Sequence, residues 1–143
     1  MSKSKNAMLN ELIEIGAAVA NIKDLDILLK KILTKTRQIA NADAGSIYIK
    51  EKDLLNFRIT QNDTQSKLLP SGKKLQYSYF TMPIDNTTIA GYVANTGETL
   101  NIKDVYKIKK SVPYKFGKKF DEKTNYRTKS MMTIPLKTHI GKI

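Results

Sequence analysis

The chain of 143 residues contains no cysteine and only one histidine, His139. Without cysteine there can be no disulfide, no thiolate metal ligand and no cysteine nucleophile. His139 lies in the turn-like stretch 137–141. A single imidazole in a solvated turn neither anchors zinc or haem by itself nor serves as the packed base of a Ser-His-Asp triad. Most hydrolase and redox chemistries are therefore disfavoured, and we expect no enzymatic activity and no metal in this chain.

Long hydrophobic runs are also missing. The longest uninterrupted apolar run, 15–20, is far too short to span a bilayer. The N-terminal stretch lacks the long apolar segment of a signal peptide. With 41% apolar and 27% charged residues, the composition is typical of one globular domain. We expect a cytoplasmic protein without membrane contact.

Positive charge is unevenly distributed along the chain. The formal charge is +12, and residues 103–129 carry ten Lys or Arg against three carboxylates, which supplies +7 of that total. Such a segment attracts an anionic ligand, a nucleic acid or an acidic partner domain, or is simply a solvated lysine-rich surface. Nucleic acid is the weaker interpretation, because no helix-turn-helix, zinc finger or aromatic stacking platform is recognisable.

Two helices open the predicted fold. Leu9, Leu12, Ile13, Gly16 and Val19 recur at a spacing of three and four, which predicts a first amphipathic helix. Asp24 is a good N-cap for a second helix that continues to about residue 40. Its basic residues are expected mostly on the face opposite its apolar stripe: Lys30, Lys31, Lys35 and Arg37.

Strand-like segments follow these helices. Residues 46–50 and 55–59 alternate in polarity around a turn at Lys52-Asp53, which predicts a β-hairpin. A polar loop is expected over 60–75 and a short strand around 79–82. Thr87 or Thr88 can cap a short helix that Gly97 ends, and strand-like segments follow at 99–102 and, as a buried strand, at 130–137. This order indicates an α+β fold with helices packed on an antiparallel sheet.

Four segments resemble the GAF domain family in order and spacing. Residues 42–48 resemble its first strand, 89–97 its central helix, 100–106 the strand after that helix, and 120–136 the approach to its fifth strand. The resemblance covers roughly residues 10–143. It is strongest to the GAF domains of cyclic-nucleotide phosphodiesterases and of bacterial proteins that place the domain before an HD or HD-GYP domain. The stretch 112–116 resembles the bacterial branch more.

The resemblance implies a ligand pocket. A serine on the first strand, the start of the central helix, a lid and an Asp-Thr-Thr pattern contact the ligand in cyclic-nucleotide binders. Carried over position by position, the implied ligand-binding residues here are Ser46, Thr60, Ile89, Ala90, Phe116, Asp121, Thr124 and Thr128. Two positions depart from the binders' pattern. Thr60 and Gln61 replace a Phe-Asp pair that stacks on and recognises the base, and Asn125 replaces a turn glycine.

Each of these positions also has a purely structural interpretation. Ser46 is then an ordinary strand residue, Thr124 caps a turn, and Asp121 pairs with surface lysines. One branch of the family is an enzyme that reduces methionine sulfoxide, and covalent bilin attachment is known in others; both need cysteines, which this chain lacks.

The expected organisation is an N-terminal signalling and dimerisation helix at 1–22 and a GAF domain at 23–143. The family usually continues with a further strand and a C-terminal helix, so we expect the domain to be truncated after Ile143. The apolar stripe of the first helix predicts a parallel homodimer, unless this helix packs back onto its own sheet. The resemblance implies a sensor without a tightly bound cofactor. It would bind a small anionic or nucleotide-like ligand, such as a cyclic nucleotide, and modulate a downstream output domain. The alternative is a ligand-free dimerisation or protein-interaction module.

Overall fold

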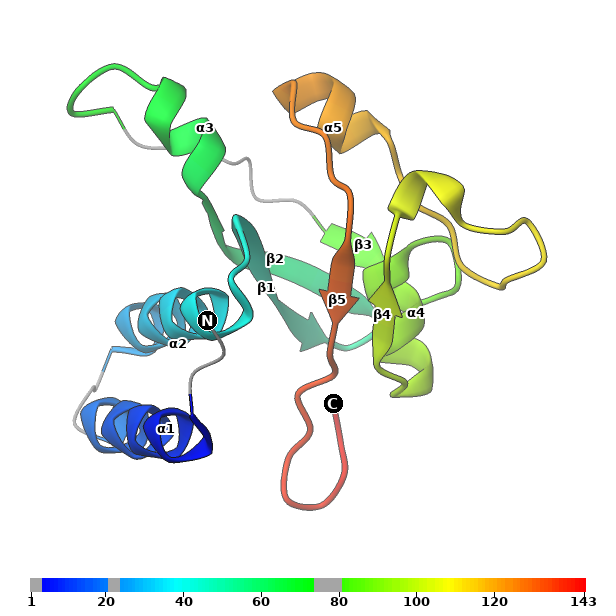
Figure 1. The fold of residues 1–143 in the computed structure, drawn as a ribbon. Helices are drawn as coiled ribbons and strands as arrows, with labels where there is room; N and C mark the ends of the chain where they lie inside the picture. Colours follow the sequence, from blue (N-terminus) through cyan, green and yellow to red (C-terminus); the bar gives the residue numbers. More distant parts are fainter. Residues whose placement is uncertain (1–3, 21–23, 74–80) are drawn as a thin grey trace. The chain divides into compact units, whose positions relative to one another are not determined.

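A computed structural model describes residues 4–20, 24–73 and 81–143 (Figure 1). These residues form two compact units. The first comprises the described residues up to Tyr48 and from Phe57 to Lys73, and the second comprises Ile49–Asn56 and the chain from Thr81 onward. Helices and antiparallel strands are both present, which confirms the expected α+β class.

Two helices begin the first unit. Helix α1 covers Lys5–Ala20 and lies beside α2, which covers Leu25–Ala40 (Figure 1). The Asp24 carboxylate accepts hydrogen bonds from the amides of Asp26 and Ile27, so the predicted N-cap is confirmed. Helix α2 ends at Asn41, which adopts the left-handed conformation with φ 51°. Asparagine tolerates this conformation better than most residues with a side chain.

The predicted hairpin is present and longer than expected. Strands β1, Ala44–Glu51, and β2, Leu54–Asn62, flank the two-residue turn at Lys52 and Asp53. The polar loop expected from Thr60 is wrong, because β2 continues to Asn62 and α3 follows at Asp63–Leu68. The Asn62 side chain accepts a hydrogen bond from the amide of Gln65 and so caps α3.

The second unit begins at a short strand. Strand β3, Thr81–Pro83, pairs antiparallel with β2, and Leu55 lies opposite Met82. The expected strand began near Tyr79, which lies outside the described residues. Helix α4 covers Ile89–Thr96, with Thr88 as its N-cap and Gly97, at φ 74°, as its C-cap. Both predicted caps of this helix are confirmed.

Strands β4 and β5 form a second sheet. Strand β4, Leu100–Ile102, pairs antiparallel with β5, Met131–Thr133, so that Asn101 lies opposite Met132. Between them lie a 3₁₀ turn, η1, at Val105–Lys107 and helix α5 at Lys119–Thr124. No helix was predicted between these two strands.

The strand expected at 130–137 is shorter and more exposed than predicted. Met132 is 58% exposed and Leu136 is 71% exposed, so the expectation of a buried strand is wrong. Within the described residues β5 pairs only with β4. Pro135, which has no N–H to donate to a ladder, follows two residues after β5.

Each unit has its own small apolar core. In the first unit Leu33 of α2 is buried, as are Phe57 and Ile59 of β2. The Tyr48 ring contacts Phe57 edge to face, with ring centroids 5.3 Å apart. The buried apolar residues of the second unit come mainly from α4 and its surroundings: Leu55, Ile89, Val93, Ala94 and Val105. Among the described helices none is long and apolar enough to cross a membrane.

Close packing at Gly91 positions the start of α4. A Cβ atom added there would lie 2.7 Å from the carbonyl oxygen of Asp85 and 2.8 Å from that of Pro83. We expect Gly91→Ala to lower the free energy of unfolding by about 1–3 kcal/mol, because the backbone must shift to admit the methyl group. Urea denaturation measures this change. Gly117→Ala is the matched control, since nothing lies within 4 Å of its added Cβ. Equal stability of the two variants would contradict the predicted clash.

Candidate functional site

The implied ligand-binding residues divide between the two units. Ser46 and Thr60 belong to the first unit, and the other six, from Ile89 to Thr128, belong to the second.

A buried carboxylate organises the second group. Asp121, on α5, is only 4% exposed. Its Oδ2 accepts hydrogen bonds of 2.7 Å from the Tyr106 hydroxyl and from the amide of Thr128, and its Oδ1 accepts one of 2.7 Å from the Thr128 hydroxyl. The interpretation of Asp121 as a surface partner of lysines is therefore wrong. This carboxylate joins η1 to the segment that enters β5.

Tyr106 is surrounded by side chains of the basic segment. Phe116 packs against its ring edge to face at 5.3 Å, and the Arg127 guanidinium lies 4.2 Å from the ring centroid. The hydrogen bond to Asp121, followed by desolvation, raises the pKa of the Tyr106 hydroxyl. Phe116, expected to form part of a lid, is thus held by Tyr106.

Thr124 lies in the last turn of α5, close to Asp121 in sequence. Its hydroxyl donates a 2.7 Å hydrogen bond to the carbonyl oxygen of Phe120. Asn125 ends the helix at φ 51° and its amide donates to the Asp121 carbonyl. Asparagine therefore adopts here the left-handed conformation that a turn glycine would supply.

The start of α4 offers free backbone donors. The Thr88 hydroxyl oxygen accepts a 2.9 Å hydrogen bond from the amide of Gly91. Within the described part of the chain, the amides of Ile89 and Ala90 make no hydrogen bond. Ile89 is buried through its side chain, and Ala90 is half-buried. A helix start of this kind suits an anionic group.

A contact between two tyrosine rings holds the loop before Phe116. This contact was not predicted from the sequence. The ring of Tyr114 lies 5.0 Å from that of Tyr92 on α4, and the Tyr92 hydroxyl donates a 2.7 Å hydrogen bond to Glu98. The loop is therefore held at Tyr114 and again at Phe116. Aromatic residues at both positions were the only sequence signal.

In the first unit, the structure brings Ser46 and Thr60 together. Their hydroxyl oxygens lie 3.1 Å apart, and the Thr60 hydroxyl also donates to the carbonyl oxygen of Gly45 at 3.2 Å. Burial raises the pKa of neighbouring Tyr48 to about 12, although a hydrogen bond with Ser46 lowers it. These two residues therefore form a small polar pair on the hairpin.

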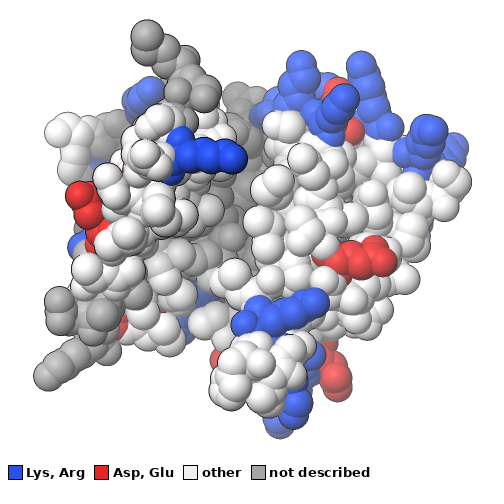
Figure 2. All heavy atoms as spheres, turned by 60° about the horizontal axis from the view of Figure 1, so that its bottom comes forward, with Lys and Arg blue, Asp and Glu red and all other residues white. Residues whose placement is uncertain are grey.

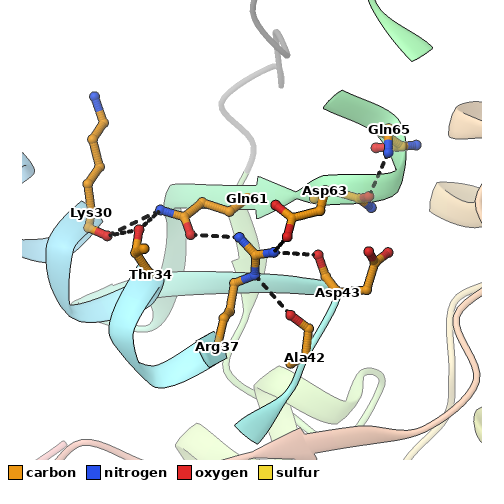
Figure 3. Close-up of polar contacts among 9 residues, drawn as sticks. Lys30, Thr34, Arg37, Ala42, Asp43, Gln61, Asp63 and Gln65 are labelled. Atoms are coloured by element: carbon orange, nitrogen blue, oxygen red, sulfur yellow. Dashed lines mark hydrogen bonds and ion pairs between the residues drawn. The ribbon is translucent and has the colours of Figure 1, made fainter. Parts of the chain in front are cut away.

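Arg37 forms a dense polar network near the same strands (Figure 3). Its guanidinium donates to the carbonyl oxygens of Ala42 and Asp43 and to the Gln61 amide oxygen, at 3.3, 2.7 and 2.9 Å. It also pairs with the Asp63 carboxylate at 2.6 Å. Arg37 is only 9% exposed, so its expected place on the solvated face of the helix is wrong. The position four residues after buried Leu33 was the available signal.

Gln61 belongs to the same network. Its amide nitrogen donates to the Thr34 hydroxyl at 2.8 Å and to the Lys30 carbonyl at 3.2 Å, while its oxygen accepts from Arg37 (Figure 3). Gln61 stands at one of the two positions where the family's binders carry the base-recognising pair. Its amide oxygen and nitrogen are instead hydrogen-bonded to residues of α2.

The basic segment 103–129 is exposed. All ten of its Lys and Arg residues are exposed, and among the residues that the structure describes only Lys107 has a carboxylate within 4 Å, that of Asp104 at 3.9 Å. Lys and Arg side chains gather at the upper right of Figure 2. Within the described residues no cluster of His, Asp and Glu suits a metal ion.

The chain belongs to the GAF domain family, whose model matches residues 24–143. It is 27% identical to a cGMP-specific 3',5'-cyclic phosphodiesterase of Drosophila ananassae and 29% identical to that of Drosophila melanogaster. Each alignment covers 91% of this chain and 11% of the relative. The chain thus spans about a tenth of the length of these relatives.

A solved structure shares the fold. Residues 122 to 287 of a methyl-accepting chemotaxis protein match with a TM-score of 0.60 and 16% identity, over 88% of this chain and 73% of that one. At this identity the likeness concerns the fold alone.

From the contacts of Arg37 we predict how its substitution changes the free energy of unfolding. Arg37→Met removes the donors that satisfy two carbonyls, Gln61 and Asp63, so we expect unfolding to become easier by about 2–4 kcal/mol. Urea denaturation gives the value. The matched control is Arg58→Met, whose partner Asp26 lies in a half-exposed pair, and it should cost less than about 1 kcal/mol. A cost for Arg37→Met no larger than the control's would refute the structural role of the network.

Proposed function

We propose that this GAF domain is a sensor that binds a small anionic or nucleotide-like ligand and regulates an attached signalling output domain. The start of α4 carries the proposal, because the amides of Ile89 and Ala90 lie beside the Thr88 cap without an acceptor in the described chain. A helix start with free amides and a partial positive charge favours a phosphate. The basic segment 103–129, with +7 of the formal charge, raises the local concentration of anions.

Names of the relatives support a nucleotide-like ligand. The matched curated proteins are named for action on cGMP, and the match covers about a tenth of their length. We propose that catalysis lies outside the segment corresponding to this chain. The output domain would then be an HD-type phosphodiesterase, a cyclase or a kinase.

Ligand binding is tested with a panel of cyclic mononucleotides, cyclic dinucleotides and simple anions, screened by thermal shift and confirmed by calorimetry. We expect at least one member to bind. Thr124→Ala with Thr128→Ala should weaken it at least tenfold, about 1.4 kcal/mol, through lost hydroxyl contacts. Thr99→Ala, at an exposed threonine before β4, is the control. Full affinity in the double variant would place the ligand elsewhere, and a complete absence of binding would favour a ligand-free interaction module.

Exposed apolar residues on α1 support a second role, dimerisation through an N-terminal helix at 1–22 ahead of a GAF domain at 23–143. Although α1 lies beside α2, Leu9 is 57% exposed, Leu12 53% and Ile13 61%. A stripe at this spacing suits a parallel two-helix seam with a second copy of the chain.

Light scattering tests the proposed dimer. Leu12→Glu with Ile13→Glu should convert a dimeric parent into a monomer, because the introduced carboxylates would lose solvation in the seam. Leu68→Glu, at a residue of α3 that is 78% exposed, should leave the mass unchanged. A dimeric mass that survives the double substitution would exclude α1 as the interface.

A further inference from the structure

The surface of residues 103–129 carries positive charge that the protein itself does not neutralise. Ten exposed lysine and arginine side chains stand there against three carboxylates of the same segment. One of these carboxylates, Asp121, is 4% exposed and accepts its hydrogen bonds from Tyr106 and Thr128. The Asp104 carboxylate lies 3.9 Å from Lys107. Among the described residues, the other nine cations have no carboxylate within 4 Å.

The backbone that carries these cations is held by aromatic contacts and buried hydrogen bonds. The ring of Tyr114 lies 5.0 Å from that of Tyr92 on α4, and Phe116 lies 5.3 Å from Tyr106. Asp121 joins α5 to Tyr106 and to the approach to β5. The lysines therefore project from a packed framework, and a partner binds them without first having to order the chain.

Two groups of lysines lie on this framework. Lys109 and Lys110 lie at the turn after η1, where the Val112 amide donates to the Lys109 carbonyl oxygen at 3.3 Å. Lys119 and Lys123 lie four residues apart and so share one face of α5. Lys and Arg side chains gather at the upper right of the face drawn in Figure 2. A partner with several negative charges would relieve the repulsion among these like charges.

Nucleic acid fits this surface poorly. Reading a groove needs an inserted helix or a two-stranded ribbon, whereas the helical elements of 103–129 have three residues in η1 and six in α5. Single strands stack their bases on exposed aromatic rings, but Tyr106, Tyr114 and Phe116 are half-buried and pack on other rings. The only arginine of the segment, Arg127, lies 4.2 Å from the Tyr106 ring centroid. Only unspecific attraction to phosphates remains.

A membrane and a second copy of the chain also fit poorly. An interfacial helix buries an apolar face among the lipid headgroups, and Phe120, at 37%, is the only large apolar side chain of 103–129 that is exposed. A second copy carries the same formal charge of +12, which opposes its approach to this surface. Carboxylates on a polypeptide do fit, because a lysine ammonium is a compact charge that pairs with a carboxylate without a fixed fork geometry.

We propose that the surface of 103–129 is a docking site for an Asp- and Glu-rich segment of another protein, whether or not a small ligand occupies the domain. The partner's carboxylates pair with the lysines of the turn after η1 and of α5. Exposed pairs of this kind act through their combined charge, so the affinity falls steeply as salt is added.

Fluorescence anisotropy with a synthetic peptide of alternating glutamate and serine tests the docking site. The same peptide with glutamine in place of glutamate is the neutral probe. We expect the parent to bind only the acidic peptide, and less tightly as salt rises. Removing four positive charges should weaken binding at least tenfold, through the combined substitutions Lys109→Gln, Lys110→Gln, Lys119→Gln and Lys123→Gln.

A matched control removes the same number of charges from exposed lysines outside the segment: Lys31→Gln, Lys50→Gln, Lys67→Gln and Lys73→Gln. Charges are screened beyond about 8 Å at physiological ionic strength, so this variant should stay within about twofold of the parent. Equal weakening in the two variants would mean that only the total charge matters, and the docking site would be refuted. Tighter binding of duplex DNA or of phosphatidylserine vesicles than of the acidic peptide would overturn the class of partner.

NMR titration of the parent locates the peptide without any substitution. Adding the acidic peptide should shift the backbone amide signals of 107–123 and leave those of α2 unchanged. Shifts of equal size in α2 would contradict the proposed docking site.

Discussion

The carboxylate of Asp121 is the group on which the second unit's candidate site depends. Burying a charge is costly unless it is well hydrogen-bonded, and this one receives three donors from Tyr106 and Thr128. Because the donors come from η1 and from the approach to β5, their bonds hold together segments that are distant in sequence. Tyr106, fixed in this way, supports Phe116 and Arg127 through its ring. A single buried anion thus orders much of a strongly cationic segment.

Arg37 has the corresponding role in the first unit. Its guanidinium uses the rigid fork of donors that distinguishes arginine from lysine, and it joins the end of α2 to the start of β1 and to the end of β2. The same bonds fix Gln61, whose side-chain amide is bonded to Arg37, Thr34 and Lys30. The side chain at one of the base-recognising positions of the family's binders is therefore oriented here by α2.

Taken together, the polar groups divide by their hydrogen-bonding character. Backbone amides at the start of α4 and the exposed lysines of 103–129 suit the anionic part of a ligand, whereas the hydroxyls of Thr124 and Thr128 donate to acceptors inside the protein. Selectivity in such a domain follows from a match of donors to acceptors, because an unpaired buried polar group costs more than a made hydrogen bond contributes. Regulation without catalysis, as we propose, needs only that the ligand bind two conformations of the domain with different affinity.

The sequence by itself determined the local features of this GAF domain. Asp24, Thr88 and Gly97 predicted helix ends, and Lys52-Asp53 predicted the hairpin turn, because caps and turns depend on side chains and backbone within a few residues. The α+β class followed from the order of the predicted helices and strands, and the family from the resemblance of four segments to GAF domains. Only the tertiary structure decided that Arg37 is buried, that Asp121 bonds Tyr106 across fifteen positions, and that Met132 is exposed. Those outcomes depend on partners far away in the chain, and neither periodicity nor local spacing carries information about which distant groups meet.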